Sequence, residues 1–273
     1  RLAAVITLCG SVPGMQIAHA GRKASSHVPW EGGKPIPVDQ GGWVPVAPSA
    51  LPAVPGATVP HALSVSEIGA VIGQFVATAR MAREAGFKVL EVHGAHGYLG
   101  HSFLSPISNR RNDGYGGDLH GRARFLMEVV EAIRAEWPSD LPLWVRLSCS
   151  DWIEGGLTIE DTVAVSRLLA ATGLVDLIDC SSGGVSHEQA IPALFPGYQV
   201  PFAEAIRHQA GIATGAVGMI TEPTHAAEIL ANGRADVVLL ARGLLADPAW
   251  PIRAAKVLGV KQEVPPQYLR AAL

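Results

Sequence analysis

Short apolar runs alternate with longer amphipathic segments along most of the chain. The runs are rich in Val, Ile and Leu and lack a strict polar alternation, which is typical of strands covered on both faces of a parallel sheet. The expected strands are 14–18, 88–92, 143–147, 175–180, 213–219 and 236–241. The amphipathic segments predict helices at 66–85, 122–137, 159–172, 203–209 and 224–232, and each ends near a Gly or Pro.

Two of these helices have recognisable starting signals. Ser64 precedes Glu67 by three residues, and Thr158 precedes Asp161 by the same spacing, so each pair can cap the first turn of its helix. The repeated strand–helix order predicts βαβ units with right-handed crossovers and a parallel sheet. Six strands are expected, whereas a closed (β/α)8 barrel has eight.

The domain organisation follows from the same pattern. Residues 1–273 are expected to form a single barrel-type domain. The segment 24–60 is dense in Pro and Gly, and we expect it to be a long excursion on one rim of the barrel. The segment 264–273 has consecutive prolines at 265 and 266, which predicts a stiff, extended C-terminal arm.

Composition excludes several classes of protein. The 273 residues are 48% hydrophobic, and 21 Lys and Arg face 24 Asp and Glu, which argues against disorder and against a nucleic-acid partner. No apolar stretch is long enough to span a bilayer. The three cysteines lie far apart, which favours a reduced, cytoplasmic setting. The apolar start of the chain is interrupted by Gly and Pro, so we do not expect a secretory signal there.

The most specific motif is 91–99, where His93 and His96 follow the end of an expected strand. Two histidines three residues apart can direct both rings to one point. A metal site would need a third ligand, which this motif does not provide. The pair is then either structural, or a twin hydrogen-bond donor that holds a substrate oxygen and stabilises negative charge on it.

Four further segments carry polar or glycine-rich patterns. Segment 105–117 has the composition of an ordered active-site loop. Segment 16–23 ends a strand with an amide and two cations, which fits a solvated rim equally well. Segments 214–221 and 240–243 close two successive strands with small residues, where backbone N–H groups and an arginine can hold a phosphate, although glycines needed only for tight turns give the same pattern.

Taken together, the motifs at 16–23, 93–98, 105–117 and 215–218 closely resemble the old yellow enzyme family. The likeness extends over essentially the whole chain and is greatest to the bacterial branch of ene-reductases and xenobiotic reductases. The resemblance implies a (β/α)8 barrel that binds FMN without a covalent bond and takes hydride from NADPH. It also implies that the substrate is an activated alkene, such as an α,β-unsaturated carbonyl compound or a nitroalkene.

The resemblance also assigns residues to the cofactor. Gln16 matches the amide that binds the pyrimidine edge of the flavin, and Arg146 matches the arginine beside its N1 and C2 oxygen. Gly218, Ala241 and Arg242 match the residues that hold the FMN phosphate.

The catalytic residues are carried over in the same way. His93 and His96 match the pair that binds the carbonyl or nitro oxygen, and Tyr98 matches the tyrosine regarded as proton donor to the alkene carbon. No metal is implied. The branch resembled here places a C-terminal arginine in a neighbour's active site. We therefore expect a homodimer or a higher homo-oligomer in which Arg270 lines a partner's substrate pocket.

The sequence departs from the family at its beginning. Nothing matches the family's first two strands, a difference of roughly 85 residues, so about six of the eight barrel units are expected. Two alternatives therefore stay open. Beside the ene-reductase that the resemblance implies, the chain could be another FMN-dependent barrel oxidoreductase. It could also be a non-catalytic or split barrel fragment that needs a partner chain, for example a complementing N-terminal fragment.

Overall fold

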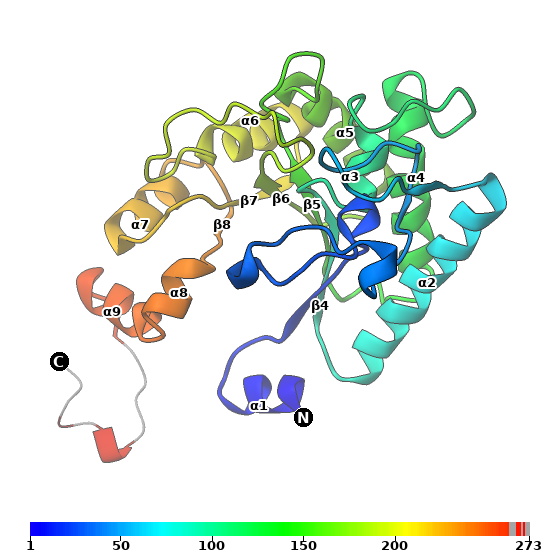
Figure 1. The fold of residues 1–273 in the computed structure, drawn as a ribbon. Helices are drawn as coiled ribbons and strands as arrows, with labels where there is room; N and C mark the ends of the chain where they lie inside the picture. Colours follow the sequence, from blue (N-terminus) through cyan, green and yellow to red (C-terminus); the bar gives the residue numbers. More distant parts are fainter. Residues whose placement is uncertain (262–265, 269, 271–273) are drawn as a thin grey trace.

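A computed structural model describes residues 1–261, 266–268 and 270, and its centre is a six-stranded parallel sheet (Figure 1). The strands are β1 (Gly14–Ile17), β4 (Val89–Gly94), β5 (Leu143–Ser148), β6 (Leu177–Ser181), β7 (Ala213–Ala216) and β8 (Val237–Val238). They are hydrogen-bonded in the order β1-β4-β5-β6-β7-β8, so each strand pairs with the next one of this set along the chain. All six strands expected from the apolar runs are present, and the barrel-type fold with six units is confirmed.

The five predicted helices are present and lie along one side of the sheet, as Figure 1 shows. They are α2 (Val65–Glu84), α4 (Leu119–Arg134), α5 (Ile159–Thr172), α6 (Val200–Ala210) and α7 (Pro223–Ala231). Both predicted caps are capping boxes: Ser64 with Glu67 begins α2, and Thr158 with Asp161 begins α5. Because each box satisfies two otherwise unpaired N–H groups, these helix starts are set locally by the sequence.

Several short elements were not predicted from the sequence. They are α1 (Leu2–Leu8), α3 (Leu99–Leu104), α8 (Arg242–Ala246), α9 (Trp250–Val257), the small parallel sheet of β2 (Val46–Ala47) and β3 (His61–Ala62), and four 3-10 turns, η1 (Gly21–Lys23), η2 (Pro29–Glu31), η3 (Val38–Gln40) and η4 (Pro266–Tyr268). Each is too short to give a clear periodicity, and packing against longer elements defines it. Two strands are also shorter than expected, since β7 ends at Ala216 and β8 spans only two residues.

The hydrophobic core lies between the sheet and the outer helices. Phe103 of α3 stacks on Phe125 of α4 with ring centroids 4.4 Å apart, and Trp137 is 1% exposed below them. Leu90, Val145 and Ile178 point from the strands into the same core. Alternate residues of these strands therefore face the opposite, inner side of the sheet.

The parallel register places polar residues in rows on this inner side. Gln16 of β1 is level with Glu91 of β4. One step further along, His93 is level with Arg146, and Arg146 is level with Asp179. Neighbours in register point to the same face of a parallel sheet, so these five side chains share the inner surface of the barrel.

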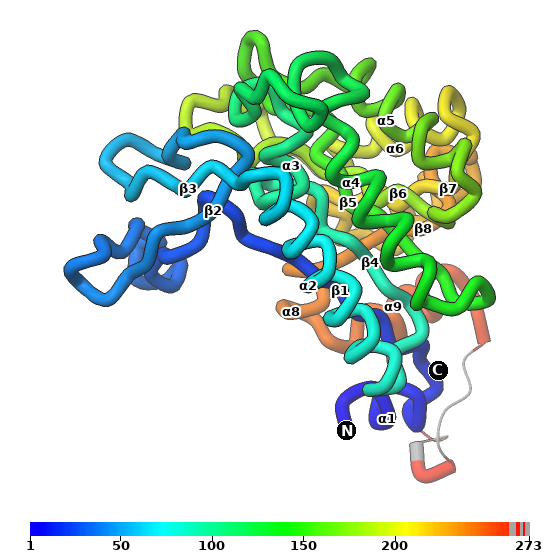
Figure 2. The backbone as a smooth tube through the Cα atoms, turned by 90° about the vertical axis from the view of Figure 1, so that its right-hand side faces the viewer, coloured from blue at the N-terminus to red at the C-terminus, as the bar shows by residue number. Residues whose placement is uncertain are grey.

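The excursion 24–60 projects beyond the carboxyl ends of the strands (Figure 2). Its first part folds back on itself, since Ser26 and Pro35 form an antiparallel bridge and the His27 N–H donates to the Lys34 carbonyl. Its second part is held by Arg111, which donates hydrogen bonds to the carbonyls of Pro48 and Leu63. The excursion is thus anchored to the loop between α3 and α4.

The C-terminal arm is only partly covered by the described residues. Pro266–Tyr268 form a single 3-10 turn, so this stretch is not the extended chain that the prolines predicted. Arg270 is exposed, and the remaining positions of the arm at 264–265, 269 and 271–273 lie outside the described residues. Within the described part, no helix is long and apolar enough to cross a membrane.

Candidate active site

The end of β4, which contains His93, and the loop after it bring His93, His96 and Tyr98 together at the carboxyl end of the strand. The rings of His93 and His96 meet edge to face with centroids 5.1 Å apart, and the ring of Tyr98 lies 4.9 Å from that of His93. The Nε2 atom of His93 and the Nδ1 atom of His96 are 3.4 Å apart. The two imidazoles that the sequence paired therefore do direct one nitrogen each to a common point.

The backbone of His96 is held in an uncommon conformation. Its φ angle is +57°, in the left-handed region that residues with a Cβ rarely adopt. The Ser148 hydroxyl accepts a hydrogen bond from the His96 N–H at 2.9 Å, and the Lys23 ammonium donates to the His96 carbonyl at 2.9 Å. Lys23 also donates to the Gly184 carbonyl at 3.1 Å, which ties the loops after β4 and β6 together. These contacts on both peptide groups fix the direction of the imidazole.

Both histidines are neutral at physiological pH. Burial, reinforced by the positive charge of Arg146, lowers the pKa of His93 to about 4 and that of His96 to about 3. The Nδ1 atom of His93 accepts a hydrogen bond from the Ala95 N–H at 3.1 Å, so the proton of its neutral ring is on Nε2. His93 thus presents an N–H donor toward His96 rather than a lone pair.

A cavity of about 540 Å3 opens beside His96 at the carboxyl ends of β5 to β8. Its volume is typical of small-molecule sites. Its lining includes His96, Arg146, Gly218, Ala241 and Arg242, five of the residues predicted for the site from widely separated parts of the sequence.

The far end of this cavity has free hydrogen-bond donors. The N–H groups of Gly218, Ala241 and Arg242 donate to no acceptor within the part of the chain that the structure describes, and the Arg242 guanidinium has no partner there either. Gly218 has φ +127°, and an added Cβ would lie 3.1 Å from the Gln199 amide, so only glycine fits. Backbone N–H groups and one unpaired guanidinium are a suitable donor set for a phosphate.

A chain of polar contacts on the inner face was only partly foreseen. Gln16 donates a short hydrogen bond to Glu91, Glu91 contacts Asp179, and Asp179 forms an ion pair with Arg146 at 3.1 Å. Burial raises the pKa of Asp179, against the lowering effect of Arg146, and the neighbouring Glu91 raises it further. Glu91 and Asp179 were missed, although an acid inside an otherwise apolar strand is a signal in itself.

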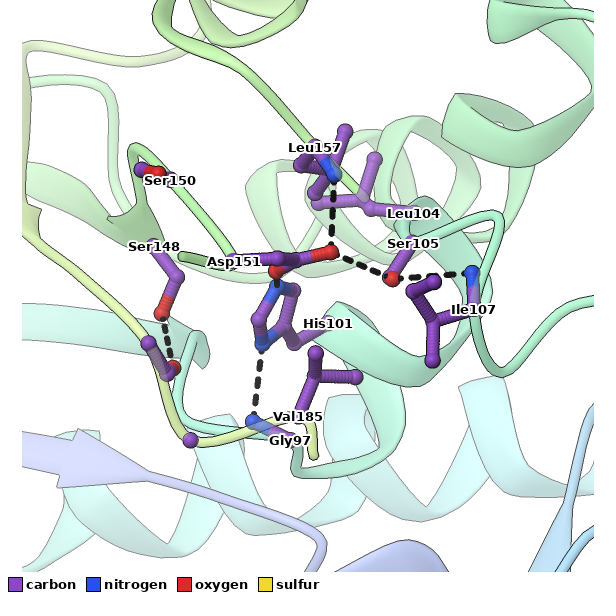
Figure 3. A network of polar contacts seen from close by, with 12 residues as sticks. Gly97, His101, Leu104, Ser105, Ile107, Ser148, Ser150, Asp151, Leu157 and Val185 are labelled. Atoms are coloured by element: carbon purple, nitrogen blue, oxygen red, sulfur yellow. Dashed lines mark hydrogen bonds and ion pairs between the residues drawn. The ribbon is translucent and has the colours of Figure 1, made fainter. Parts of the chain in front are cut away.

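A second buried network lies beneath the loop and was also missed (Figure 3). The side chains of His101 and Asp151 are completely buried, with His101 Nε2 2.8 Å from Asp151 Oδ1. Asp151 Oδ2 accepts hydrogen bonds from the Ser105 hydroxyl at 2.6 Å and from the Leu157 N–H at 2.8 Å. The Gly97 N–H donates to His101 Nδ1 at 2.8 Å, so the network supports the backbone between His96 and Tyr98.

Two predicted residues lie apart from this assembly. Gln16 is directed to Glu91 on the adjacent strand and does not line the cavity, although the chain of contacts described above connects it with Arg146. Arg270 is exposed at the end of the chain and is not among the residues that line the cavity. The roles of all these residues stay predictions.

The parallel strand–helix units, with a cavity and convergent donors at the carboxyl ends of the strands, define an enzyme of the β/α-barrel class. Comparison with known proteins makes this specific. Residues 2–260 match the model of the NADH:flavin oxidoreductase / NADH oxidase family, and the chain belongs to this family.

Curated relatives support the same conclusion. The chain is 48% identical to an NADPH dehydrogenase of Geobacillus thermodenitrificans over 264 residues, which is 96% of this chain and 71% of the relative. It is 46% identical to the NADPH dehydrogenase of Bacillus subtilis, again over 96% of this chain and 71% of the relative. The chain thus spans about 71% of these proteins' length.

Solved structures agree with the fold. A 2-naphthoyl-CoA reductase, solved with 2-naphthoyl-CoA, superposes with a TM-score of 0.80 at 30% identity over 95% of this chain and 40% of its own. A morphinone reductase variant in complex with tetrahydroNAD superposes with a TM-score of 0.72 at 26% identity over 97% of this chain and 71% of its own. The family resemblance and the cofactors FMN and NADPH are confirmed by these comparisons, and the chain is an FMN-dependent oxidoreductase.

Proposed function

We propose that this chain reduces C=C bonds that are activated by a carbonyl or nitro group, with NADPH as the source of hydride. The observation that carries the proposal is the convergence of His93 Nε2 and His96 Nδ1, which lie 3.4 Å apart, with His96 lining the cavity. Two neutral donors at this spacing suit a single oxygen on which negative charge develops. Bound FMN would supply the hydride to the β carbon of the alkene.

The protein's own residues would do the rest. His93 and His96 would bind the substrate oxygen and hold the conjugated system in place. The ring of Tyr98 lies next to His93, and its centroid is 5.8 Å from the Lys23 ammonium. Its phenol would donate its proton to the α carbon. Because His93 is buried and His96 is half-buried, their hydrogen bonds to the oxygen compete little with water.

The cofactor would be held by residues of the cavity. Gly218, Ala241 and Arg242 would bind the phosphate through the free donors described above. Arg146 would lie against the flavin ring, where its charge favours the reduced anion, and Gln16 would bind the pyrimidine edge from the neighbouring strand. The ion pair with Asp179 supports this by fixing the position of the Arg146 guanidinium.

The test is anaerobic NADPH oxidation by the FMN-loaded chain with cyclohex-2-enone and a nitroalkene. Replacing His93→Ala and His96→Ala together should lower alkene reduction by about a hundredfold or more, since each convergent donor has an effect of that order. FMN should stay bound, and binding of a phenol such as 4-hydroxybenzaldehyde should be lost. The matched control is His120→Ala, an exposed histidine of α4. Unchanged phenol binding in the double variant would refute the proposal.

A second candidate is favoured by the open edges of the sheet. β1 and β8 each pair with one neighbour only among the described strands, so a partner chain could add strands to either edge. In that case the purified chain alone would bind no FMN, and its native mass would rise on addition of the complementing fragment.

A further inference from the structure

The inner face of the sheet holds two carboxyl groups in contact with each other and one guanidinium. Asp179 of β6 is 2% exposed, and its Oδ2 atom forms an ion pair with Arg146 Nε at 3.1 Å. Glu91 of β4 contacts the same carboxyl group and accepts a hydrogen bond from the Gln16 amide. Of these four residues only Arg146 lines the cavity. The two acids therefore lie behind the guanidinium.

One oxygen of Asp179 lacks a hydrogen-bond donor. Asp179 Oδ1 is buried, and no N–H or O–H group of the described residues donates to it. A buried polar atom without a partner is costly. The neighbour that remains is the carboxyl group of Glu91, and a carboxyl group can donate only when it carries a proton. A proton held between the two carboxyl groups satisfies Oδ1 and leaves Oδ2 to Arg146.

The charges of the cluster lead to the same result. Two ionised carboxylates in contact and out of water repel each other, and one guanidinium neutralises only one of them. Burial, opposed by the charge of Arg146 and reinforced by Glu91, raises the pKa of Asp179 to about 8. Two interacting acids lose their protons in two steps, so at neutral pH the pair carries one proton and one negative charge.

Strands β6 and β7 bring no further charge to the pair. Gly215 of β7 is level with Asp179 and has no side chain. Cys180 points to the core on the opposite face, where burial raises the pKa of its thiol, so the thiol is uncharged. Ser181, two positions beyond Asp179 on the same face, lies 2.7 Å from His96 Nε2.

Strands β1, β4 and β5 contribute one charged side chain. Gln16 of β1 is an uncharged amide. His93 lies two positions beyond Glu91 on the same face, and its pKa of about 4 leaves the ring neutral. Arg146 of β5 is then the single charged group that acts on the two acids among the described residues.

We propose that Glu91 and Asp179 share one proton at neutral pH and act as a single negative charge that holds the Arg146 guanidinium at the wall of the cavity. Both acids are positioning residues, because Glu91 acts through Gln16 and Asp179 acts through Arg146. The shared proton depends only on contacts within this chain. Its consequence for FMN rests on the proposed function, in which Arg146 lies against the flavin ring.

The direct test is a pH titration of the two carboxyl carbons by 13C NMR, in the chain labelled at its Asp and Glu side chains and without added cofactor. The signals are assigned by their loss in Asp179→Asn and in Glu91→Gln. We expect one titration step above pH 7 that appears in both signals, because the two groups share the proton. Two signals that stay at their ionised positions from pH 6 to pH 9 would overturn the proposal.

Glu91→Gln separates sharing from burial alone. The glutamine amide keeps the size of the side chain and can offer Asp179 Oδ1 an N–H donor that does not titrate. The step of Asp179 should move down by about one pH unit or more, since the like charge is gone and Arg146 remains. The matched control is Glu188→Gln, an exposed glutamate of the loop after β6, which should leave the step in place. An unchanged step in Glu91→Gln would show that burial alone protonates Asp179, and sharing would be wrong.

FMN binding measures the consequence for Arg146. Above the titration step the pair carries a second negative charge, which weakens the field of the guanidinium at the cavity. The FMN affinity of the parent chain should therefore fall about threefold or more between pH 7 and pH 9, a range above the second pKa of a phosphate, about 6. In Glu91→Gln it should change less than about twofold over the same range, because the pair no longer titrates there.

The outcomes distinguish this inference from the proposed function. An equal loss of affinity with pH in the parent chain and in Glu91→Gln overturns the role of the pair, because the titrating group would then lie elsewhere. A chain that binds no FMN is judged by the NMR titration, which needs no cofactor. A chain that shows the shared step and the expected FMN affinities but reduces no alkene refutes the proposed function and leaves the carboxyl pair intact.

Discussion

Removing the carboxylate of Asp151 should strongly lower the free energy of unfolding of the chain. Asp151 and His101 are completely buried, and Asp151 accepts from three donors: His101, the Ser105 hydroxyl and the Leu157 N–H. Asp151→Ala leaves all three without their acceptor. Breaking a buried charged network in this way costs about 3–5 kcal/mol, out of the roughly 5–15 kcal/mol by which a domain is stable.

The measurement is equilibrium urea unfolding followed by tryptophan fluorescence and far-UV circular dichroism. Asp140→Ala is the control, because Asp140 is exposed in the turn after α4 and should change the free energy of unfolding by less than about 0.5 kcal/mol. A loss below about 1 kcal/mol in Asp151→Ala would show that the network contributes little, and the reasoning from its buried contacts would be wrong.

A conservative substitution should transmit the same perturbation to the active-site loop. In Asp151→Asn, the amide oxygen can still accept from Ser105 and Leu157, but the amide N–H group then faces His101 Nε2. His101 must then accept at Nε2 and carry its proton on Nδ1. In the parent chain the Gly97 N–H donates to this Nδ1 atom at 2.8 Å, so in the variant two N–H groups would face each other. Faster hydrogen exchange of the Gly97 amide is the expected sign, and unchanged exchange would contradict this pathway.

Two further predictions concern charge in the site. Arg242→Ala should weaken FMN binding about tenfold or more, as expected for loss of a hydrogen bond between charged groups, and an unchanged affinity by fluorescence titration would remove Arg242 from the phosphate site. Burial lowers the pKa of His93 to about 4 and of His96 to about 3, so below the unfolded value of about 6.5 the unfolded chain binds more protons than the folded chain. The stability from these rings should therefore be complete above about pH 6.5 and decline toward pH 4, and an NMR titration with a midpoint for either ring near pH 6.5 would disprove it.

The parts of the fold that were predictable are those that local sequence determines. Apolar runs gave all six strands, and Ser64 and Thr158 marked the starts of two helices because a capping box needs only four neighbouring residues. The site motif around His93 and His96 was equally local. The two edge-to-face rings, the left-handed backbone of His96 and the contact with Ser181 follow from packing across three strands, and sequence spacing alone does not contain them.

The polar residues on the inner face of the sheet show most clearly what the sequence alone does not predict. Glu91 and Asp179 are 88 positions apart in the numbering and become neighbours only because β4, β5 and β6 pair in one register. A shift of one residue would turn each of them to the opposite face. Register is set by the summed packing of the core, so a contact that depends on it could not be read from either strand alone.

The folded-back part of the excursion, closed by the bridge between Ser26 and Pro35, has a consequence for how members of this family could diverge. Trp30 at its outer end is 82% exposed, whereas Lys23 at its base holds the His96 carbonyl. Because the bridge lies between tip and base, insertions or deletions at the tip need not alter the base. The rim over the catalytic loop can therefore vary in length and shape under selection for new substrates, while the histidine donors beneath it keep their position and orientation.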